Sequence, residues 1–267
     1  MHIILTHEQA DFDALGASLG AYLLNEKAIP ILPRRINRNG RAFVTLYGAE
    51  LPFVEARDLP PEPIETVTLV DTQSLNTMKG MSAATRVHVI DHHPLRRDLP
   101  EDWIVRGERL GACTTHFVEI LSEHNGNLSV INATLLLLGI YEDSGSLTYV
   151  GTTPRDIRAA AYLLEHGASL RIANQYLNPP LSPEQRRVYD LLLSVAETHT
   201  IHGHTIVLAC ANMEEMTEEV SSVAHKLRDL LDPDALLLLV QKNDGNRLVA
   251  RSKNDQITVA SIAAEFG

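Results

Sequence analysis

The sequence predicts an α/β fold, with a parallel-sheet domain followed by a smaller α/β domain. Short apolar runs alternate with stretches of helical periodicity, as in chains of strand–helix units. The runs 67–70 and 87–90 end directly at Asp71 and Asp91. Functional groups of parallel sheets lie at the carboxyl ends of the strands, so these acids mark one edge of the sheet. The pattern changes after a proline-rich segment at 178–183, where we place the domain boundary.

The first domain is predicted to span residues 1–177, with strands at 3–5, 67–70 and 87–90. Helical periodicity covers 14–24, 114–124 and 130–141. A further helix is expected to run to residue 165. It begins with Thr153 as N-cap and Pro154 at the first helical position, where proline lacks only an N–H that would be unpaired anyway.

A linker helix is predicted within residues 178–198, opened by Pro183, and a second domain over 199–267. This second domain is expected to hold three strands, two helices and one hairpin turn. These elements are strands 205–210, 235–241 and 248–252, helices 218–231 and 259–266, and a turn at 243–246.

Composition limits the class of protein. The 267 residues are 45% hydrophobic, which is enough for one or two domains with a core. Because 34 acidic residues outnumber 23 basic ones, a global basic footprint for duplex DNA is excluded, although a local basic patch is not. Cys113 and Cys210 lie in no CxxC motif and are expected to be reduced, buried thiols. No signal peptide or membrane span is evident, so a cytoplasmic location without a membrane partner is expected.

The first candidate motif is His7, Asp11 and Asp13, directly after the first strand. Carboxylate oxygens and an imidazole nitrogen suit Mn²⁺ or a similar cation. Since Asp11 and Asp13 are two residues apart on a turn, they project differently and can serve two neighbouring ions. The alternative is that one of these acids simply caps the following helix.

Three further motifs follow along the chain. Asp71 stands alone after its strand, and taken by itself it is better explained by turn formation or helix capping. In Asp91-His92-His93, one imidazole can bind metal while the other meets substrate, and Asp91 can orient an imidazole from behind; a solvated polar loop is the alternative. Asp143 ends an apolar helix, where the helix dipole disfavours an acid; a bound cation or simple exposure would offset that cost.

The order and spacing of these four motifs resemble those of the DHH phosphoesterase superfamily over nearly the whole chain. The resemblance implies two Mn²⁺ ions, with Mg²⁺ or Co²⁺ as alternatives. It implies that Asp71 and Asp143 are shared between the ions, and that the active site lies in the cleft between the two domains. The implied catalytic residues are Asp71, His92, His93 and Asp143.

The resemblance also assigns the remaining ligands. His7 and Asp11 would complete one ion site, and Asp13 and His92 the other. His93 would face the substrate phosphate, with Asp91 behind the histidine pair. Five carboxylates in one cleft repel each other without metal, so a bound cation should raise stability.

The second half resembles the DHH-associated domain of the RecJ and nano-RNase branch, at residues 249–253 and 262–267. The resemblance implies that Arg251 and Ser252 contact substrate phosphate or nucleotide, with a guanidinium fork and a hydroxyl. A solvated hairpin is the alternative. His225, on a family-like helix at 220–228, is a further candidate for substrate binding, or an ordinary surface or core histidine.

Two more expectations concern the longer protein. Relatives continue past the Phe-Gly at 266–267 into a glycine-rich loop with a histidine, so we expect a truncated second domain and additional C-terminal domains. The segment 6–13 resembles DHH modules fused to a tRNA nucleotidyltransferase or poly(A)-polymerase-like domain. Whether the chain forms a homodimer is left open by the sequence.

The sequence therefore predicts a Mn²⁺-dependent phosphoesterase that hydrolyses short oligonucleotides, as a nano-RNase or exonuclease does. The alternatives are a nucleotide phosphatase, a cyclic-dinucleotide phosphodiesterase, and a non-enzymatic RNA- or nucleotide-binding module of a tRNA-processing protein. The basic run 34–41 either steers a polyanion to the site or is a solvated loop.

Overall fold

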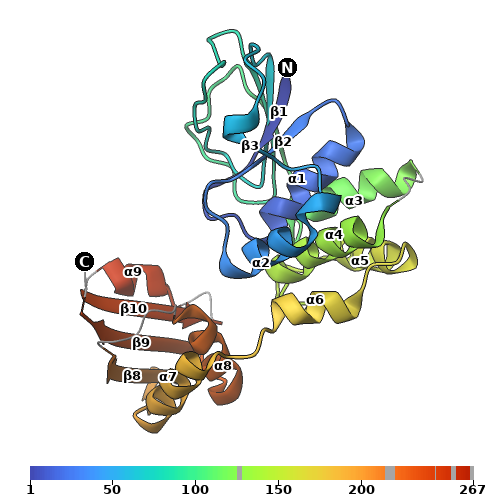
Figure 1. Cartoon of the computed structure of the whole chain (residues 1–267). Helices are drawn as coiled ribbons and strands as arrows, with labels where there is room; N and C mark the ends of the chain where they lie inside the picture. The colour runs from blue at the N-terminus through green and yellow to red at the C-terminus, as the bar shows by residue number, and fades with distance from the viewer. Residues whose placement is uncertain (125–127, 214–219, 244, 254–256, 265–267) are drawn as a thin grey trace. The chain divides into compact units, whose positions relative to one another are not determined.

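The structure is a computed structural model that describes residues 1–267 except 125–127, 214–219, 244, 254–256 and 265–267. The chain divides into two compact units, Met1–Pro179 and Pro180–Gly267 (Figure 1). Each unit has its own hydrophobic core, and each is described by itself below. No helix in the described part of the chain is long and apolar enough to cross a membrane.

The first unit contains a six-stranded sheet in the order β3-β2-β1-β4-β5-β6, in which every strand pair is parallel. The α/β fold class is thereby confirmed. All five residues of β4 are buried, as expected for an inner strand of a parallel sheet covered on both faces. The strands are β1 (His2–Leu5), β2 (Ile29–Leu32), β3 (Val54–Glu55), β4 (Thr66–Val70), β5 (Arg86–Asp91) and β6 (Ile104–Gly107).

The helices of this unit pack against one another at very short range. A Cβ on Gly139 would lie 2.5 Å from Thr114 Oγ1 and 2.9 Å from the carbonyl oxygen of Phe12. A Cβ on Gly16 would lie 2.6 Å from the same Thr114 oxygen. These glycines bring the start of α1, the start of α3 and the end of α4 together. The helices are α1 (Phe12–Leu24), α2 (Arg38–Tyr47), α3 (Cys113–Glu123), α4 (Val130–Asp143), α5 (Pro154–Glu165) and α6 (Leu170–Leu177), with 3₁₀ turns at Gly48–Glu50 and Ala56–Asp58.

The second unit holds a four-stranded mixed sheet in the order β10-β9-β8-β7, of which only β8 and β9 are parallel. Side chains of α7 and α8, such as Leu192 and Leu227, share a core with Val207 and Leu238 of the sheet. The elements are α7 (Pro183–Ser194), β7 (Glu197–Ile201), β8 (His204–Asn212), α8 (Ser221–Leu231), β9 (Ala235–Lys242), β10 (Gly245–Ser252) and α9 (Val259–Ala264).

The linker helix predicted within 178–198 differs in the structure. It begins at Pro183, because Ser182 and Gln185 form a capping box, and it ends at Ser194. Residues 197–198 instead belong to β7, which pairs with β8. The helix is part of the second unit's core. Three positions of predicted elements lie outside the described residues: 218 of the helix 218–231, 244 of the turn 243–246, and 266 of the helix 259–266. Both cysteines are free, but Cys210 is exposed rather than buried.

Candidate metal centre

The four predicted motifs converge at one edge of the first unit. Because β1, β4 and β5 are adjacent and parallel, their carboxyl ends lie side by side. The loops that follow these strands carry three of the motifs, and the C-terminus of α4 brings the fourth. In the described chain, three groups of side chains are close enough to hold a cation, with ligand atoms within 4.8 Å of one another: His7, Asp11 and Asp71; Asp13, His92 and Asp143; and Asp71, Asp91, His92 and His93.

Asp71 lies at the centre of the cluster. Its Oδ2 is 3.4 Å from His7 Nε2, and its Oδ1 is 3.5 Å from His92 Nε2. The residue is buried and has left-handed backbone geometry, with φ of 55°. Such geometry is uncommon for a non-glycine residue and tends to occur at functional sites. It directs the two oxygens of one carboxylate toward two different groups of ligands.

The first group has its atoms oriented by the surrounding backbone. His7 Nδ1 donates to the carbonyl oxygen of Glu8 at 2.8 Å, which turns Nε2 toward Asp71 and Asp11. The hydrogen bond to Asp71 raises the pKa of His7 to about 9, against the effect of burial. Asp11 also caps α1 by accepting from Ala14 N at 3.0 Å. Asp11 therefore both caps helix α1 and belongs to the cluster.

The second group is organised around His92. Its Nδ1 donates to the carbonyl oxygen of Leu110 at 3.1 Å, so Nε2 faces the carboxylates. That nitrogen is 3.3 Å from Asp143 Oδ2 and 3.7 Å from Asp13 Oδ2. Burial of the ring disfavours its charged form, but the nearby carboxylates of Asp143 and Asp13 raise the pKa of His92 to about 10.

Asp13 is completely buried and is held by the N-terminus of α3. Its Oδ2 accepts from Cys113 N at 2.7 Å, and its Oδ1 accepts from Thr114 N at 2.8 Å. Burial, followed by repulsion from Asp71 and Asp143, raises the pKa of Asp13 well above its ordinary value. Burial also raises the pKa of Asp11 and of Asp71. The cluster thus concentrates negative charge that only protons or a cation can neutralise.

Asp91 lies behind the cluster and contacts His93. Its Oδ1 accepts from His93 Nδ1 at 2.9 Å, and its Oδ2 accepts from Gln73 Nε2 at 2.7 Å. Burial alone would raise the pKa of Asp91, but these two hydrogen bonds lower it to about 2. Asp91 therefore stays ionised and fixes the ring of His93, which is half exposed. Sequence reasoning missed Gln73, although it stands only two residues after Asp71.

Glu142 is a second residue that sequence reasoning missed. Its Oε2 accepts from Phe12 N at 2.5 Å, and its Oε1 accepts from Asn37 Nδ2 at 3.2 Å. Burial, followed by the charge of Asp11, raises the pKa of Glu142 to about 8. This side chain ties the end of α4 to the starts of α1 and α2, and so it positions its neighbour Asp143. Its place directly before Asp143 was the only signal in the sequence.

The donor set fits divalent cations. Asp71 Oδ1 and His92 Nε2 are buried, and neither has a hydrogen-bond partner among the described residues. A buried polar atom without a partner costs about 1–3 kcal/mol, and a cation between these two atoms would satisfy both. Aspartate oxygens with imidazole nitrogens suit Mn²⁺ and similar ions. Asp71 belongs to groups on both sides of the cluster, whereas Asp143 belongs only to the group with Asp13 and His92.

The other predicted substrate residues lie in the second unit. Ser252 Oγ donates to the carbonyl oxygen of Asp234 at 3.2 Å, and Arg251 Nη1 donates to that of Ala250 at 3.0 Å. His225 lies on α8. Partial burial, followed by the charge of Arg251, lowers the pKa of His225. Helix α8 and strand β10, which carry His225 and Arg251, pack against each other in this unit.

Comparison with known proteins agrees with this geometry. The sequence model of the DHH family, N-terminal domain, matches residues 2–140, which contain every motif except the last. The chain belongs to the DHH family. The acidic cluster of this family member could hold a metal ion.

Particular relatives cover almost the whole chain. An A-adding tRNA nucleotidyltransferase of Geobacter sulfurreducens is 33% identical over 100% of this chain, and the match spans only 31% of that protein. The bifunctional oligoribonuclease and PAP phosphatase NrnA of Mycoplasma genitalium is 29% identical over 99% of this chain and 84% of its own length. A solved exopolyphosphatase-related protein of Bacteroides fragilis shares the fold with a TM-score of 0.71 at 16% identity, over 94% of this chain and 78% of its own. The predicted resemblance to DHH modules linked to a tRNA nucleotidyltransferase is thus confirmed at the level of sequence similarity.

Proposed function

We propose that this chain hydrolyses phosphodiester bonds of short oligonucleotides with two Mn²⁺ ions bound at the cluster. The observation that carries the proposal is the central position of Asp71, whose two oxygens face His7 on one side and His92 on the other. One ion would be held by His7, Asp11 and Asp71, and the other by Asp13, His92, Asp143 and Asp71. Divalent cations supply Lewis-acid stabilisation to a phosphoryl group undergoing displacement.

The protein's own side chains would orient the substrate. His93 is half exposed, and its ring is fixed by Asp91, so it can donate a hydrogen bond from Nε2 to a phosphoryl oxygen. Because Asp91 has a pKa of about 2, it keeps His93 Nδ1 protonated across the neutral range. In the second unit, Arg251 and Ser252 offer a guanidinium and a hydroxyl as candidate phosphate-binding groups.

Two alternatives are supported by particular observations. The similarity to a bifunctional oligoribonuclease and PAP phosphatase favours a nucleotide phosphatase activity at the same cluster. The similarity to a tRNA nucleotidyltransferase favours an RNA- or nucleotide-binding module within a longer tRNA-processing protein. In that second case the cluster would bind cations without turnover.

The test is hydrolysis by the purified chain with Mn²⁺ on four substrates: labelled di- to pentanucleotides, phosphoadenosine phosphate, cyclic di-AMP and pyrophosphate. Release of mononucleotides from the oligomers, lost in Asp71→Asn, is the expected result. Turnover of phosphoadenosine phosphate or cyclic di-AMP alone would replace the proposal with the corresponding alternative. Binding of RNA without turnover of any substrate would favour the binding module.

A further inference from the structure

A cavity of about 340 Å³ opens beside the cluster, on the loops that carry His7 and Asp71. Thr6 and Glu8, the chain neighbours of His7, both line it. Ser74, three residues after Asp71, lines it from the other loop. Its volume lies in the range of small-molecule sites, which run from about 300 to 1,000 Å³. Consecutive Cα atoms are about 3.8 Å apart, so the backbone of the loop that lines the cavity is also the backbone that carries the candidate ligand His7.

The walls of the cavity are of two kinds. Leu32, Pro33, Ala56 and Met78 provide apolar surface from β2, the segment after it, the Ala56–Asp58 turn and the loop after β4. Such walls suit the flat, apolar faces of a ring. They do not suit a phosphate, whose charge would lose its hydration against them.

Polar groups stand among these walls. Thr6 lines the cavity, and its Oγ1 is buried with no hydrogen-bond partner within the described residues, so a hydroxyl with unused hydrogen-bonding capacity lies in the wall. Glu8 offers acceptors, Arg34 offers donors, and Asn76 offers both. A ring with apolar faces and a hydrogen-bonding edge, attached to a diol, matches this arrangement. A nucleoside has that chemistry.

The rim is fixed to the metal loop by backbone pairing. Ala10 N donates to the carbonyl oxygen of Arg35 at 3.1 Å, and Asn37 N donates to that of Ala10 at 2.8 Å. These bonds hold the segment that carries Arg34 beside the loop that carries Asp11. Of the basic residues of this segment, Arg34 lines the cavity, where a positive charge favours an anionic ligand.

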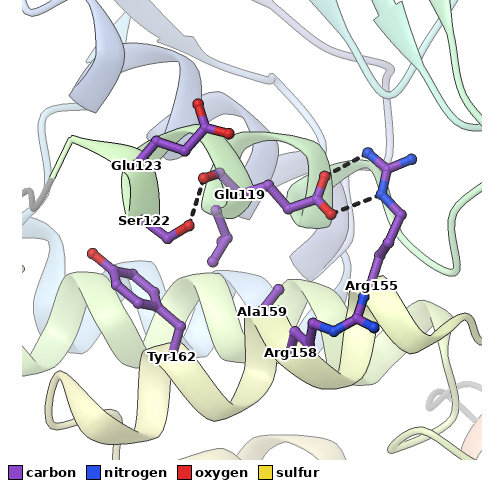
Figure 2. Close-up of a pocket in the computed structure, with 8 residues that line it drawn as sticks. Glu119, Ser122, Glu123, Arg155, Arg158, Ala159 and Tyr162 are labelled. Carbon is purple, nitrogen blue, oxygen red and sulfur yellow. Dashed lines mark hydrogen bonds and ion pairs between the residues drawn. The ribbon is translucent and has the colours of Figure 1, made fainter.

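A second, larger cavity serves as a contrast. It is about 450 Å³ and lies between α3 and α5, as Figure 2 shows. Its Arg155 is already paired with Glu119 and Glu108, and the carboxylates of Glu119 and Glu123 would repel a nucleotide. Ser122 in this groove lies nine residues along α3 from Cys113, which contacts Asp13 of the cluster. At the rise of an α-helix this is about 13 Å, so Ser122 serves as a control position away from the cluster.

We propose that the cavity beside His7 and Asp71 holds the nucleoside part of a nucleotide whose phosphate lies at the cluster. This assignment rests on the proposed function, because it places that phosphate at the cation ligands. It makes the first unit, and not only the second, a source of selectivity for nucleotides over other phosphate esters.

The test compares AMP with ribose 5-phosphate, which lacks the base, by titration calorimetry on the whole chain with Mn²⁺. Wild type should bind AMP at least about tenfold more tightly than ribose 5-phosphate, a factor that corresponds to about 1.4 kcal/mol. Ala56→Leu, which fills the cavity, should remove this difference. Thr6→Val, which keeps the shape and removes the hydroxyl, should lower AMP affinity about threefold to tenfold. Ser122→Ala, in the groove of Figure 2, should change neither affinity.

Equal binding of AMP and ribose 5-phosphate by wild type would overturn the assignment, as would equal losses for both ligands in Ala56→Leu. If Ala56→Leu fails to fold by circular dichroism, Thr6→Val decides, and unchanged AMP affinity there counts against the assignment. If dinucleotides are hydrolysed but the substitutions in the cavity leave AMP binding unchanged, only this inference fails. If AMP binding depends on the cavity but nothing is hydrolysed, only the proposed function fails.

Discussion

The carboxylate of Asp13 caps the N-terminus of α3 across 100 residues of sequence, with Oδ2 accepting from Cys113 N at 2.7 Å. Its other oxygen accepts from Thr114 N at 2.8 Å. The same carboxylate belongs to the cluster with His92 and Asp143. One side chain therefore joins the packing of α1 on α3 to the candidate metal centre, whereas Asp11 caps only its own helix, α1.

Asp13→Ala should destabilise the metal-free protein more than Asp143→Ala. Asp13→Ala leaves the buried N–H groups of Cys113 and Thr114 without their acceptor, which costs about 1–3 kcal/mol for each. Asp143→Ala removes a charge that repels Asp13 but also favours the charged form of His92, so these two effects oppose each other and the free energy of unfolding should change little. Urea unfolding in EDTA measures both. A similar loss in the two variants would contradict the capping role.

Mn²⁺ should raise the melting temperature of wild type, because cations relieve repulsion among the buried carboxylates. At a concentration a hundred times the dissociation constant, binding adds about 2.7 kcal/mol per site. Asp71→Asn should abolish the shift, since Asp71 faces both groups of ligands. Asp143→Asn should retain a smaller shift, because the His7 group does not include it. Glu123→Gln, an exposed change on α3, is the control and should match wild type. Full retention of the shift in Asp71→Asn would contradict a shared ligand.

Asp156 should make stability depend on pH. Its buried carboxylate accepts from Gly111 N, Thr115 Oγ1 and Thr153 N. Burial alone would raise its pKa, but these hydrogen bonds lower it below the ordinary value. The stabilisation is therefore fully present above the unfolded pKa of about 3.9 and is lost as pH falls through the lower, folded pKa.

Asp156→Asn removes this contribution and should reduce the free energy of unfolding at neutral pH by about 1–3 kcal/mol. The difference from wild type should shrink as pH falls below about 4, because the wild-type carboxylate is then protonated as well. Urea titrations between neutral and acidic pH measure this difference. Asp102→Asn, an exposed acid of the same unit, is the matched control. A difference that stays constant over the whole pH range would rule out the linkage.

Gly139→Ala should destabilise the first unit, although alanine favours helices over glycine by about 1 kcal/mol. The added Cβ would lie 2.9 Å from the backbone oxygen of Phe12, which cannot move without shifting Asp11 and Asp13. Overpacking of this kind costs about 1–3 kcal/mol. We expect a lower melting temperature together with weaker Mn²⁺ binding. Gly151→Ala, where the Cβ would meet open space, is the control.

Local patterns in the sequence predicted the strands that position the candidate site. The runs 67–70 and 87–90 are mostly apolar, and all five residues of β4 are buried, as expected for an inner strand of a sheet covered on both faces. Helix signals also predicted α5, since Thr153 and Pro154 act within one turn of the helix. The edge strands β3, β6 and β7 and the inner strand β2 escaped prediction. They are short or exposed, and β7 has no buried residue, so they carry little of the alternation or apolar run that marks a strand.

The sequence by itself determined which residues are candidates, because metal-ligand residue types stand directly after strands in a recognisable order. Only the tertiary structure decided how they are divided. It placed Asp71 between His7 and His92, set Asp91 against His93, and confined Asp143 to the group with Asp13. It also added Gln73 and Glu142, whose roles depend on hydrogen bonds to residues 18 and 130 positions away. Contacts over such distances depend on how the strands and helices pack, and no local pattern records that packing.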